Sequence, residues 1–486
     1  MIRTKIVATM GPACNSVGML HQLFEAGVDL CRLNFSHGKL EEHGRMLLNI
    51  REASIHHGQP IAVLGDLGGP KIRLGQVADA GGTGGMAIEV GEEFIIQREA
   101  MVGQNKRASS TYPQLIDDVR VGDRLLIEDG LLRFVCDDKN FNEIRCKCTV
   151  GGVLKSSKGI NLPDTTVNIP SITRKDWECI EWAIENDLDY LGLSFVRKAD
   201  ELNLVREHLR NRSSGIQLIA KIEKAEAVHH IEPIIDAADG LMIARGDLGV
   251  EMDVAEVPII QKDLIRRCQV AGKPVIVATQ MLQSMIEISS PTRAEVSDVA
   301  NAIFDGTDAV MLSGETSVGK YPAATVRTMS HIAKVTEKYL NSSGRIEQLP
   351  QVKLKTMQLS AAAATGVRQM VVELKATAVV IYSQTGATAR IFSKHRFPVP
   401  IIALSSDHGA LRRMALHYGV TPCELAPSND LVELVTRIDR LMQELKHAQP
   451  GDRIVIVAGA SLGTPGTMNG IILHTVGENW SPDSGS

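Results

Sequence analysis

The sequence lacks an apolar run long enough to span a membrane, which takes about 20 residues in succession. It also lacks an excess of charge of one sign, since 52 Lys and Arg stand against 57 Asp and Glu and the formal net charge is −5. Such a balance provides no overall field that would attract a polyanion. We therefore expect no interaction with membranes or nucleic acids.

The eight cysteines lack the clustering that a zinc site or a disulfide framework requires. Cys146 and Cys148 are the only close pair, and two thiols at this spacing on a strand are a poor zinc site without further ligands. The first residues reach Gly11 and Pro12 too early for the apolar core of a signal peptide. We therefore expect reduced, structural thiols in a cytoplasmic protein.

The sequence does contain a series of eight short apolar runs, each of which ends in polar residue types. Helical patterns, such as residues 201–209 and 257–270, lie between most of these runs. Eight alternating β and α units predict an α/β fold, the (β/α)8 or TIM barrel, which carries its chemistry at the carboxyl ends of the strands. The expected strands are residues 5–9, 28–33, 61–64, 190–193, 217–220, 240–244, 275–278 and 309–312.

Two segments break this pattern, and the length of 486 residues suggests about three domains. Between residues 70 and 170 the helical period gives way to short β-type runs divided by glycines and Asp-Gly turns. We expect a small all-β domain there, a β-barrel inserted as a lid. Residues 346–486 predict a C-terminal open α/β domain with strands at 378–382, 401–404 and 454–457, so the catalytic barrel would comprise residues 1–69 and 171–345.

Lys221, Glu223 and Asp247 stand where two successive predicted strands end. Residues two apart on a strand point to the same side, so Lys221 and Glu223 would face the barrel mouth together, with Asp247 arriving from the next strand. Two carboxylates suit Mg²⁺ or Mn²⁺, and a neighbouring lysine can neutralise a migrating phosphoryl group. For either segment alone, a surface ion pair is the simpler interpretation.

A second alternating set follows the second predicted strand. Arg32, Asn34 and Ser36 would point together into the barrel mouth. In isolation this triplet could merely cap the end of the barrel. Together with a metal and a lysine it is compatible with phosphoryl transfer, which depends mainly on positioning and charge neutralisation.

Seven segments carry a more specific signal. They are NFSHG (34–38), GPKIR (69–73), AKIE (220–223), ARGDLG (244–249), ATQML (278–282), PTRAE (291–295) and MLSGET (311–316). Each resembles a motif of the pyruvate kinase family, bacterial type. One such motif is modest evidence, but these occur in the family's order along essentially the whole chain.

The resemblance implies a glycolytic phosphotransferase that moves the phosphoryl group of phosphoenolpyruvate to ADP and yields pyruvate and ATP. Lys221 would stabilise the transferring group, Arg32 would bind the phosphate, and Thr279 would help to protonate the enolate through water. Glu223 and Asp247 would hold the divalent metal, Mg²⁺ or Mn²⁺. Substrate contacts would come from Arg32, from the backbone at Ala244, Arg245 and Gly246, from Asp247 and Thr279, and from Ser313 and Glu315 at the rear of the pocket.

The resemblance also implies nucleotide contacts. They would come from Asn34, His37 and Arg73, and from Lys158 on the lid. On the residues alone, His37 is more often a packing or hydrogen-bonding residue than a functional one.

One departure from the family pattern bears on a K⁺ site, which the resemblance would place at Asn34, Ser36, Asp66 and Leu67. Many members of the family have threonine where this chain has Leu67, and an acidic residue where it has Lys71. The acidic version accompanies a K⁺ requirement. A lysine ammonium can supply the same positive charge, so we expect K⁺ to be dispensable.

Ser383, Thr385, Gly386 and Thr388 lie between a predicted strand and a predicted helix of the C-terminal domain. Hydroxyl groups, a glycine and a helix amino end suit a phosphate, and a plain strand–helix turn is the alternative interpretation. The resemblance implies a phosphorylated allosteric effector at this position. It also implies subunit contacts near residues 291–293, in a homotetramer.

Two other functions remain open on the residues alone. A metal-dependent TIM-barrel aldolase or lyase acting through a pyruvate enolate would share Glu223 and Asp247, but it would need neither a lid nor Arg73 and Lys158. A catalytically inactive scaffold that senses phosphorylated metabolites would have no use for Lys221. Turnover with phosphoenolpyruvate and ADP separates these functions.

Overall fold

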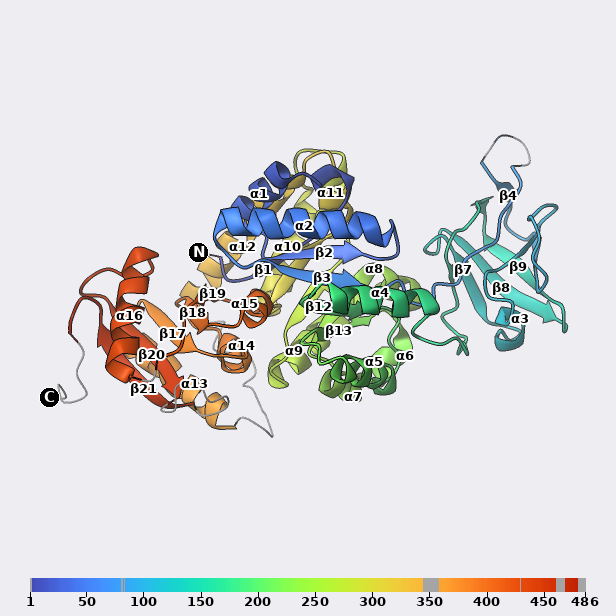
Figure 1. The fold of residues 1–486 in the computed structure, drawn as a ribbon. Helices are drawn as coiled ribbons and strands as arrows, with labels where there is room; N and C mark the ends of the chain where they lie inside the picture. The colour runs from blue at the N-terminus through green and yellow to red at the C-terminus, as the bar shows by residue number, and fades with distance from the viewer. Residues whose placement is uncertain are drawn as a thin grey trace.

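The computed structural model describes residues 2–79, 82, 84–343, 358–428, 430–459 and 468–479. Figure 1 shows three lobes in a row, with a barrel in the middle, the inserted domain on one side and the C-terminal domain on the other. None of the helices in the described part of the chain combines the length and apolar character that a membrane span requires.

Within the described residues, eight parallel strands close into a barrel in the order β1-β16-β15-β14-β13-β12-β3-β2. The predicted TIM barrel is therefore confirmed. Parallel pairing brings all carboxyl ends to one rim, where for example Asn34 pairs with Asp66. The strands are β1 (Lys5–Thr9), β2 (Leu30–Asn34), β3 (Ala62–Asp66), β12 (Tyr190–Leu193), β13 (Gln217–Ile222), β14 (Gly240–Ala244), β15 (Val275–Ala278) and β16 (Ala309–Leu312).

Helices surround this barrel, and their buried apolar faces pack against the outward-facing strand residues. Local signals define several ends; the Thr292 hydroxyl, for example, accepts from the backbone of Glu295 and caps α10. The helices are α1 (Val17–Ala26), α2 (Leu40–His57), α4 (Arg174–Glu185), α5 (Ala199–Asn211), α6 (Ala225–His229), α7 (Ile231–Ala237), α8 (Arg245–Glu251), α9 (Val257–Val270), α10 (Arg293–Phe304), α11 (Gly314–Ser317) and α12 (Pro322–Ser343), with 3-10 turns η1 (Pro12–Cys14) and η2 (Gln283–Ile286).

The inserted domain follows β3 and has its own apolar core. Its main sheet has the order β11-β7-β8-β9-β5-β6, with β10 and β4 paired beside it. Isolated bridges from Arg73 to Gly159 and from Leu74 to Ser110 span the two edges of the main sheet, in place of the closing strand that a β-barrel would need. The elements are β4 (Met86–Ile88), β5 (Glu93–Gln97), β6 (Arg107–Ser109), β7 (Arg124–Ile127), β8 (Leu132–Lys139), β9 (Glu143–Val150), β10 (Gly152–Leu154), β11 (Ile160–Asn161) and a short helix α3 (Leu115–Asp118), which a strictly all-β domain would lack.

The C-terminal domain is the predicted open α/β sheet. Its described strands have the order β19-β18-β17-β20-β21, and β21 is antiparallel to β20. A buried ion-pair cluster joins the domain to the barrel, because Lys394 and Arg396 both contact the carboxylate of Asp308. The elements are α13 (Gln358–Leu374), β17 (Ala378–Tyr382), α14 (Ala387–Lys394), β18 (Ile401–Ser405), α15 (His408–Met414), β19 (Val420–Glu424), α16 (Leu431–Glu444), β20 (Arg453–Gly459) and β21 (Met468–Thr475).

Candidate active site

Lys221 lies at the carboxyl-terminal rim of the barrel, on β13, and is only 8% exposed. Its Nζ lies 2.9 Å from Glu223 Oε1 and 3.1 Å from Asp66 Oδ1, and it donates a hydrogen bond to Ser194 Oγ at 2.5 Å. Burial alone would lower the pKa of the ammonium, but the Asp66 and Glu223 carboxylates outweigh it and raise the pKa above its ordinary value. Lys221 therefore stays cationic at neutral pH.

Asp66 ends the neighbouring strand β3 and holds a second cation. Its Oδ2 accepts a hydrogen bond from Arg32 Nε at 2.6 Å, while Arg32 Nη1 donates to Thr9 Oγ1 at 3.0 Å. Burial would raise the pKa of the Asp66 carboxyl, but Lys221 and Arg32 reverse the effect and lower it. The ionised carboxylate thus fixes Lys221 and Arg32 side by side, as a phosphate-binding pair requires.

Glu223 and Asp247 form a pair of carboxylates beside Lys221. Glu223 is 2% exposed, and its Oε2 accepts from the backbone N–H of Phe195 at 2.7 Å. Burial has the largest effect on the Glu223 carboxyl and raises its pKa. The ammonium of Lys221 lowers the pKa and the charge of Asp247 raises it, and the net shift is upward. The described residues contain no cluster of three or more His, Cys, Asp or Glu that could hold a metal. The pair nevertheless fits a divalent ion that takes its other ligands from substrate and water, and such an ion would relieve the repulsion between the two carboxylates.

Thr279 faces the start of α8. Its Oγ1 accepts from the backbone N–H of Gly246 at 2.8 Å and donates to the carbonyl of Ala278 at 2.6 Å. Thr279 and Gln280 both have positive φ, +69° and +56°, which is costly for residues with a side chain and is typical of functional sites. The strained turn brings the Thr279 hydroxyl to the amino end of α8.

The Arg245 side chain is held by Asp298 and supports this turn. It forms a two-pronged ion pair with Asp298 on α10, at 2.6 and 2.7 Å, and Nη2 donates to the carbonyl of Thr279 at 2.9 Å. Any contact between Arg245 and substrate would therefore come from its backbone.

Glu315 is fully buried under the loops that follow β15 and β16. Its Oε1 accepts from the backbone N–H of Leu282 at 3.1 Å, and Oε2 accepts from that of Ser313 at 2.7 Å. The carboxylate holds these loops together from below.

The residues after β2 line a separate hollow. Asn34 and His37 are among the residues that enclose a cavity of about 780 Å³ next to the rim. Asn34 Oδ1 accepts from the backbone N–H of Ser36 at 3.2 Å, and Ser36 is exposed. Leu67 is buried, and its carbonyl accepts from Ser194 Oγ at 2.7 Å.

The predicted lid residues contact partners within the inserted domain, which stands beside the barrel in Figure 1. Arg73 Nη1 donates to the carbonyl of Ser157 at 3.0 Å, and Lys158 Nζ lies 2.6 Å from Glu128 Oε1. The stem of Lys71 packs on Gly159, where an added Cβ would lie 2.9 Å from Lys71 Cε. These contacts tie the Arg73 and Lys158 side chains to their own domain.

The predicted effector segment connects β17 to α14. Gly386 has φ of +82° and precedes the helix, its N–H donates to the carbonyl of Ser383 at 3.2 Å, and Thr388 lies in the first turn. Thr385 completes the turn. The segment thus has the strand–turn–helix form that is required by both interpretations of the sequence, a phosphate-binding site and a plain turn.

Ser194 and Phe195 belong to the site, although the sequence analysis assigned them no role. Ser194 Oγ lies between Lys221 Nζ and the carbonyl of Leu67, and the N–H of Phe195 holds Glu223. Both directly follow the predicted strand at 190–193. Their position at the carboxyl end of that strand is therefore the sequence feature that could have identified them as residues of the site.

Comparison with known proteins agrees with this geometry. The model of the pyruvate kinase barrel domain matches residues 1–326, and that of the pyruvate kinase alpha/beta domain matches residues 361–474. The chain belongs to the pyruvate kinase family. Among its relatives, pyruvate kinase of Geobacillus stearothermophilus is 44% identical over 482 residues, which cover 98% of this chain and 81% of the relative. Pyruvate kinase of Mycobacterium intracellulare is 41% identical over 477 residues, covering 98% and 99%. Membership confirms the resemblance seen in the motifs and makes the chain an enzyme, a phosphotransferase that works with a divalent metal.

Proposed function

We propose that this chain transfers the phosphoryl group of phosphoenolpyruvate to ADP, which gives pyruvate and ATP in glycolysis. The observation that carries the proposal is the buried ammonium of Lys221, held at 2.9 Å from Glu223 and beside Arg32 at the rim of the barrel. A fixed cation of this kind stabilises charge on a migrating phosphoryl group without rearranging in the transition state. Kinship over nearly the whole chain supports the same reaction.

In this reaction the substrate phosphate lies between Lys221 and Arg32, which Asp66 holds in place through its two carboxylate oxygens. The substrate carboxylate faces the backbone N–H groups of Arg245 and Gly246 at the start of α8, and Gly246 would exchange its present bond to Thr279 Oγ1 for one to the substrate. Thr279 then lies beside the enolate and directs a water molecule that protonates it. These roles require the named side chains and backbone groups to lie together at the carboxyl-terminal rim of the barrel, where they can hold one substrate molecule in position.

We infer that the divalent metal is Mg²⁺, or Mn²⁺ in its place, bound by Glu223 and Asp247. Both ions prefer carboxylate oxygens and retain positions for substrate and water. When bound, the metal supplies positive charge that polarises the substrate's oxygens. Lys221 offsets part of the negative charge of Glu223, and the metal would offset the charge that Glu223 and Asp247 share.

We infer that ADP occupies the cavity bordered by Asn34 and His37, next to the phosphate site. Arg73 and Lys158 would reach its phosphates when the inserted domain moves toward the barrel. Their present partners, the carbonyl of Ser157 and the carboxylate of Glu128, lie in the same domain and would have to be exchanged. An aldolase or lyase has no use for such a lid.

We further infer that the enzyme works without K⁺. Asp66 contacts Arg32 and Lys221, and the carbonyl of Leu67 accepts from Ser194, so both groups already have protein partners. Lys71 lies on the hinge of the inserted domain and would add positive charge near the substrate phosphates as the lid moves.

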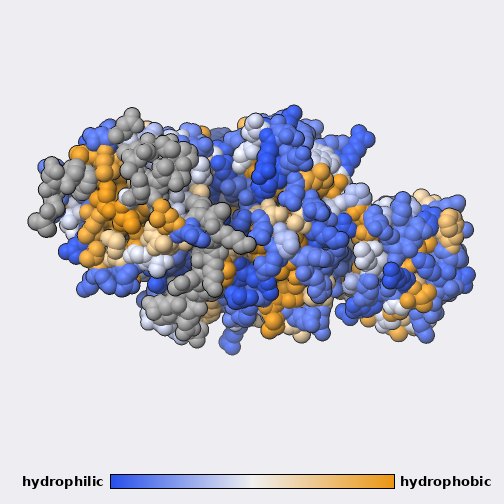
Figure 2. All heavy atoms as spheres, turned by 90° about the horizontal axis from the view of Figure 1, so that it is seen from below, coloured by the Kyte–Doolittle hydropathy of each residue, from blue (hydrophilic) through white to orange (hydrophobic). Residues whose placement is uncertain are grey.

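A homotetramer with a phosphorylated allosteric effector completes the proposal. Apolar side chains are exposed on two elements of the C-terminal domain, Leu359 and Val372 on α13 and Ile471 and Leu473 on β21. Figure 2 shows hydrophobic surface over this domain, as expected of a subunit contact. The effector phosphate would bind at Ser383, Thr385, Gly386 and Thr388, and the same kinship supports a cytoplasmic location.

The proposal is tested by coupled assays of pyruvate and ATP with phosphoenolpyruvate, ADP and Mg²⁺. We expect equal amounts of the two products, and none in the absence of ADP. Cleavage or condensation of a pyruvate-containing substrate without ATP formation would instead indicate a lyase or aldolase.

A further inference from the structure

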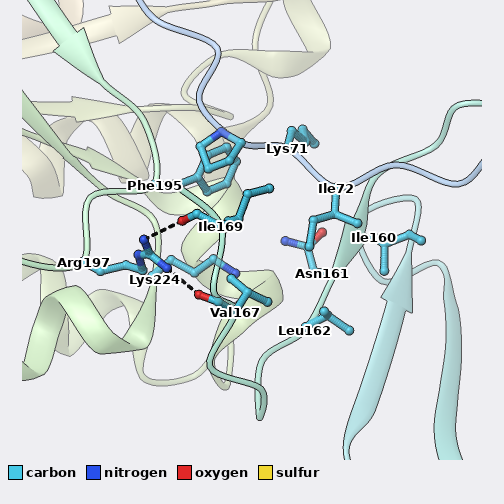
Figure 3. A pocket seen from close by; sticks show the side chains of 11 residues that line it. Lys71, Ile72, Ile160, Asn161, Leu162, Val167, Ile169, Phe195, Arg197 and Lys224 are labelled. Atoms are coloured by element: carbon cyan, nitrogen blue, oxygen red, sulfur yellow. Dashed lines mark hydrogen bonds between the residues drawn. The ribbon is translucent and has the colours of Figure 1, made fainter. Parts of the chain in front are cut away.

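The inserted domain meets the barrel at a narrow pocket where the chain crosses between the two domains (Figure 3). Its lining comes from the outgoing chain, which includes Lys71, from the returning chain, which includes Asn161 and Val167, and from the barrel, which includes Arg197 and Lys224. Both crossings border this pocket, so it marks the hinge of the inserted domain.

Glu251, the last residue of α8, provides a buried contact across this hinge. Its side chain is 3% exposed, and Oε1 accepts from Lys224 Nζ at 2.6 Å and from Asn161 Nδ2 at 2.9 Å. Lys224 directly follows Glu223 in the barrel, whereas Asn161 ends β11 of the inserted domain. One carboxylate thus connects the inserted domain with the metal-site loop and with the helix that carries Asp247.

The contact between Glu251 and Asn161 is strong because both side chains are buried. Asn161 is 6% exposed, and its amide donates to a charged acceptor. A hydrogen bond to a charged group shifts an equilibrium by about 10- to 100-fold, well beyond what an exposed ion pair achieves.

A second anchor lies a few residues further along the returning chain. The Arg197 guanidinium donates to the carbonyls of Val167 at 2.7 Å and Ile169 at 3.0 Å, and to Ser171 Oγ at 2.9 Å; the bonds to Val167 and Ile169 appear as dashed lines in Figure 3. The Arg197 anchor holds the end of the returning segment on the barrel, and Glu251 holds its beginning. A domain attached at these points turns about them. Arg73 bridges Gly159 and Lys158 lies three residues before Asn161, so both cations belong to the part of the domain that turns about the pin.

We propose that Glu251 is a positioning residue, which pins the inserted domain at its hinge through Asn161 and thereby sets how often Arg73 and Lys158 reach the nucleotide. The inference rests on the proposed function. Without the pin the lid samples more orientations, and fewer of them place both cations over ADP. Steps that need no nucleotide are unaffected.

The test is N161A, with N168A as its matched control. Asn168 also belongs to the inserted domain, but its side chain bonds Asp118 within that domain. For N161A we expect the KM for ADP to rise about tenfold, proton exchange at C3 of pyruvate to keep its wild-type rate, and small-angle X-ray scattering to show a broader distribution of shapes. N168A should match wild type in all three.

A double-mutant cycle assigns the effect to the contact. In an E251A background, or E251M if E251A does not melt cooperatively, N161A should have little further effect on the KM for ADP, because neither alanine nor methionine offers an oxygen that accepts from Asn161. An unchanged or lower KM in N161A, an equal loss of phosphoryl transfer and proton exchange, or a full effect of N161A without Glu251 would each overturn the proposal. A wild-type protein that forms no ATP would refute the proposed function instead, and the scattering comparison would still test the pin.

Discussion

Replacing Lys221 with methionine keeps the apolar stem of the side chain and removes the ammonium that contacts Asp66 and Glu223. We expect phosphoryl transfer to fall by about 10²–10⁴-fold, the range for losing one preorganised electrostatic group. Proton exchange at C3 of pyruvate should fall much less, because no phosphoryl group moves in that step. The ratio of the two rates therefore reports the role of Lys221 specifically.

The same substitution has a defined cost in stability. Breaking a buried ion pair lowers the free energy of unfolding by about 3–5 kcal/mol. For K221M we expect the lower end of this range, because Asp66 still accepts a hydrogen bond from Arg32 and Glu223 still accepts one from the N–H of Phe195. In the wild type, the pKa of Asp66 is lower in the folded state than in the unfolded chain. The ionised carboxylate therefore stabilises the fold above about pH 3.9, and this stabilisation is lost as pH falls through the folded-state pKa.

The pH dependence of this cost has a definite sign. In K221M the ammonium is gone, so the pKa values of the Asp66 and Glu223 carboxyls rise. The folded variant then binds protons at these two groups more readily than the unfolded chain does. Its stability then falls as pH rises through those raised values, and the deficit in Tm against wild type should be larger at about pH 8 than at about pH 5. Thermal melting at the two pH values measures it.

The control for K221M is K5M. Lys5 is also a buried lysine in a barrel strand, but it pairs with Asp29 at 2.9 Å outside the site. K5M should be less stable than the wild type but should keep the wild-type ratio of the phosphoryl-transfer rate to the rate of proton exchange at C3 of pyruvate. The role assigned to Lys221 would be refuted if K221M lost both rates equally, or if its transfer rate stayed within about threefold of K5M.

The remaining predictions concern the metal, the monovalent cation and the domain contact. E223Q and D247N should each raise the Mg²⁺ concentration needed for half-maximal rate and lower turnover; wild-type rates at limiting Mg²⁺ in both variants would contradict the metal site. The unmodified enzyme should turn over in tetraalkylammonium salts without K⁺, and K71E should lose that activity and regain part of it with K⁺; strict K⁺ dependence of the wild type would refute the role of Lys71. D308N should lower the free energy of unfolding by about 3–5 kcal/mol, because it leaves buried Lys394 without its counter-charge, and a Tm equal to that of wild type would contradict this.

The barrel could be predicted in detail because its strands are short apolar runs between helical patterns. The ends of β1, β12, β14, β15 and β16 agree with the expected ranges, and alternation along β13 correctly brought Lys221 and Glu223 together. Local sequence carries such information, since side-chain direction on a strand depends only on position.

Contacts between distant segments could not be predicted in this way. Nothing local indicates that Asp66 pairs with Arg32 and Lys221, or that the Arg245 side chain turns to Asp298, since each contact depends on strand order and loop path. In the C-terminal domain, β19 escaped recognition because Pro422 interrupts its apolar run. The four-residue helix α3 is too short to show a helical period.

The most direct test of the account is steady-state turnover of the unmodified chain with phosphoenolpyruvate, ADP and Mg²⁺, with pyruvate and ATP measured together. We predict saturable formation of both products in equal amounts, abolished by a metal chelator. Pyruvate released without ATP, or no turnover from a folded protein that binds phosphoenolpyruvate, would contradict the assignment of Lys221, Arg32 and the carboxylate pair to phosphoryl transfer.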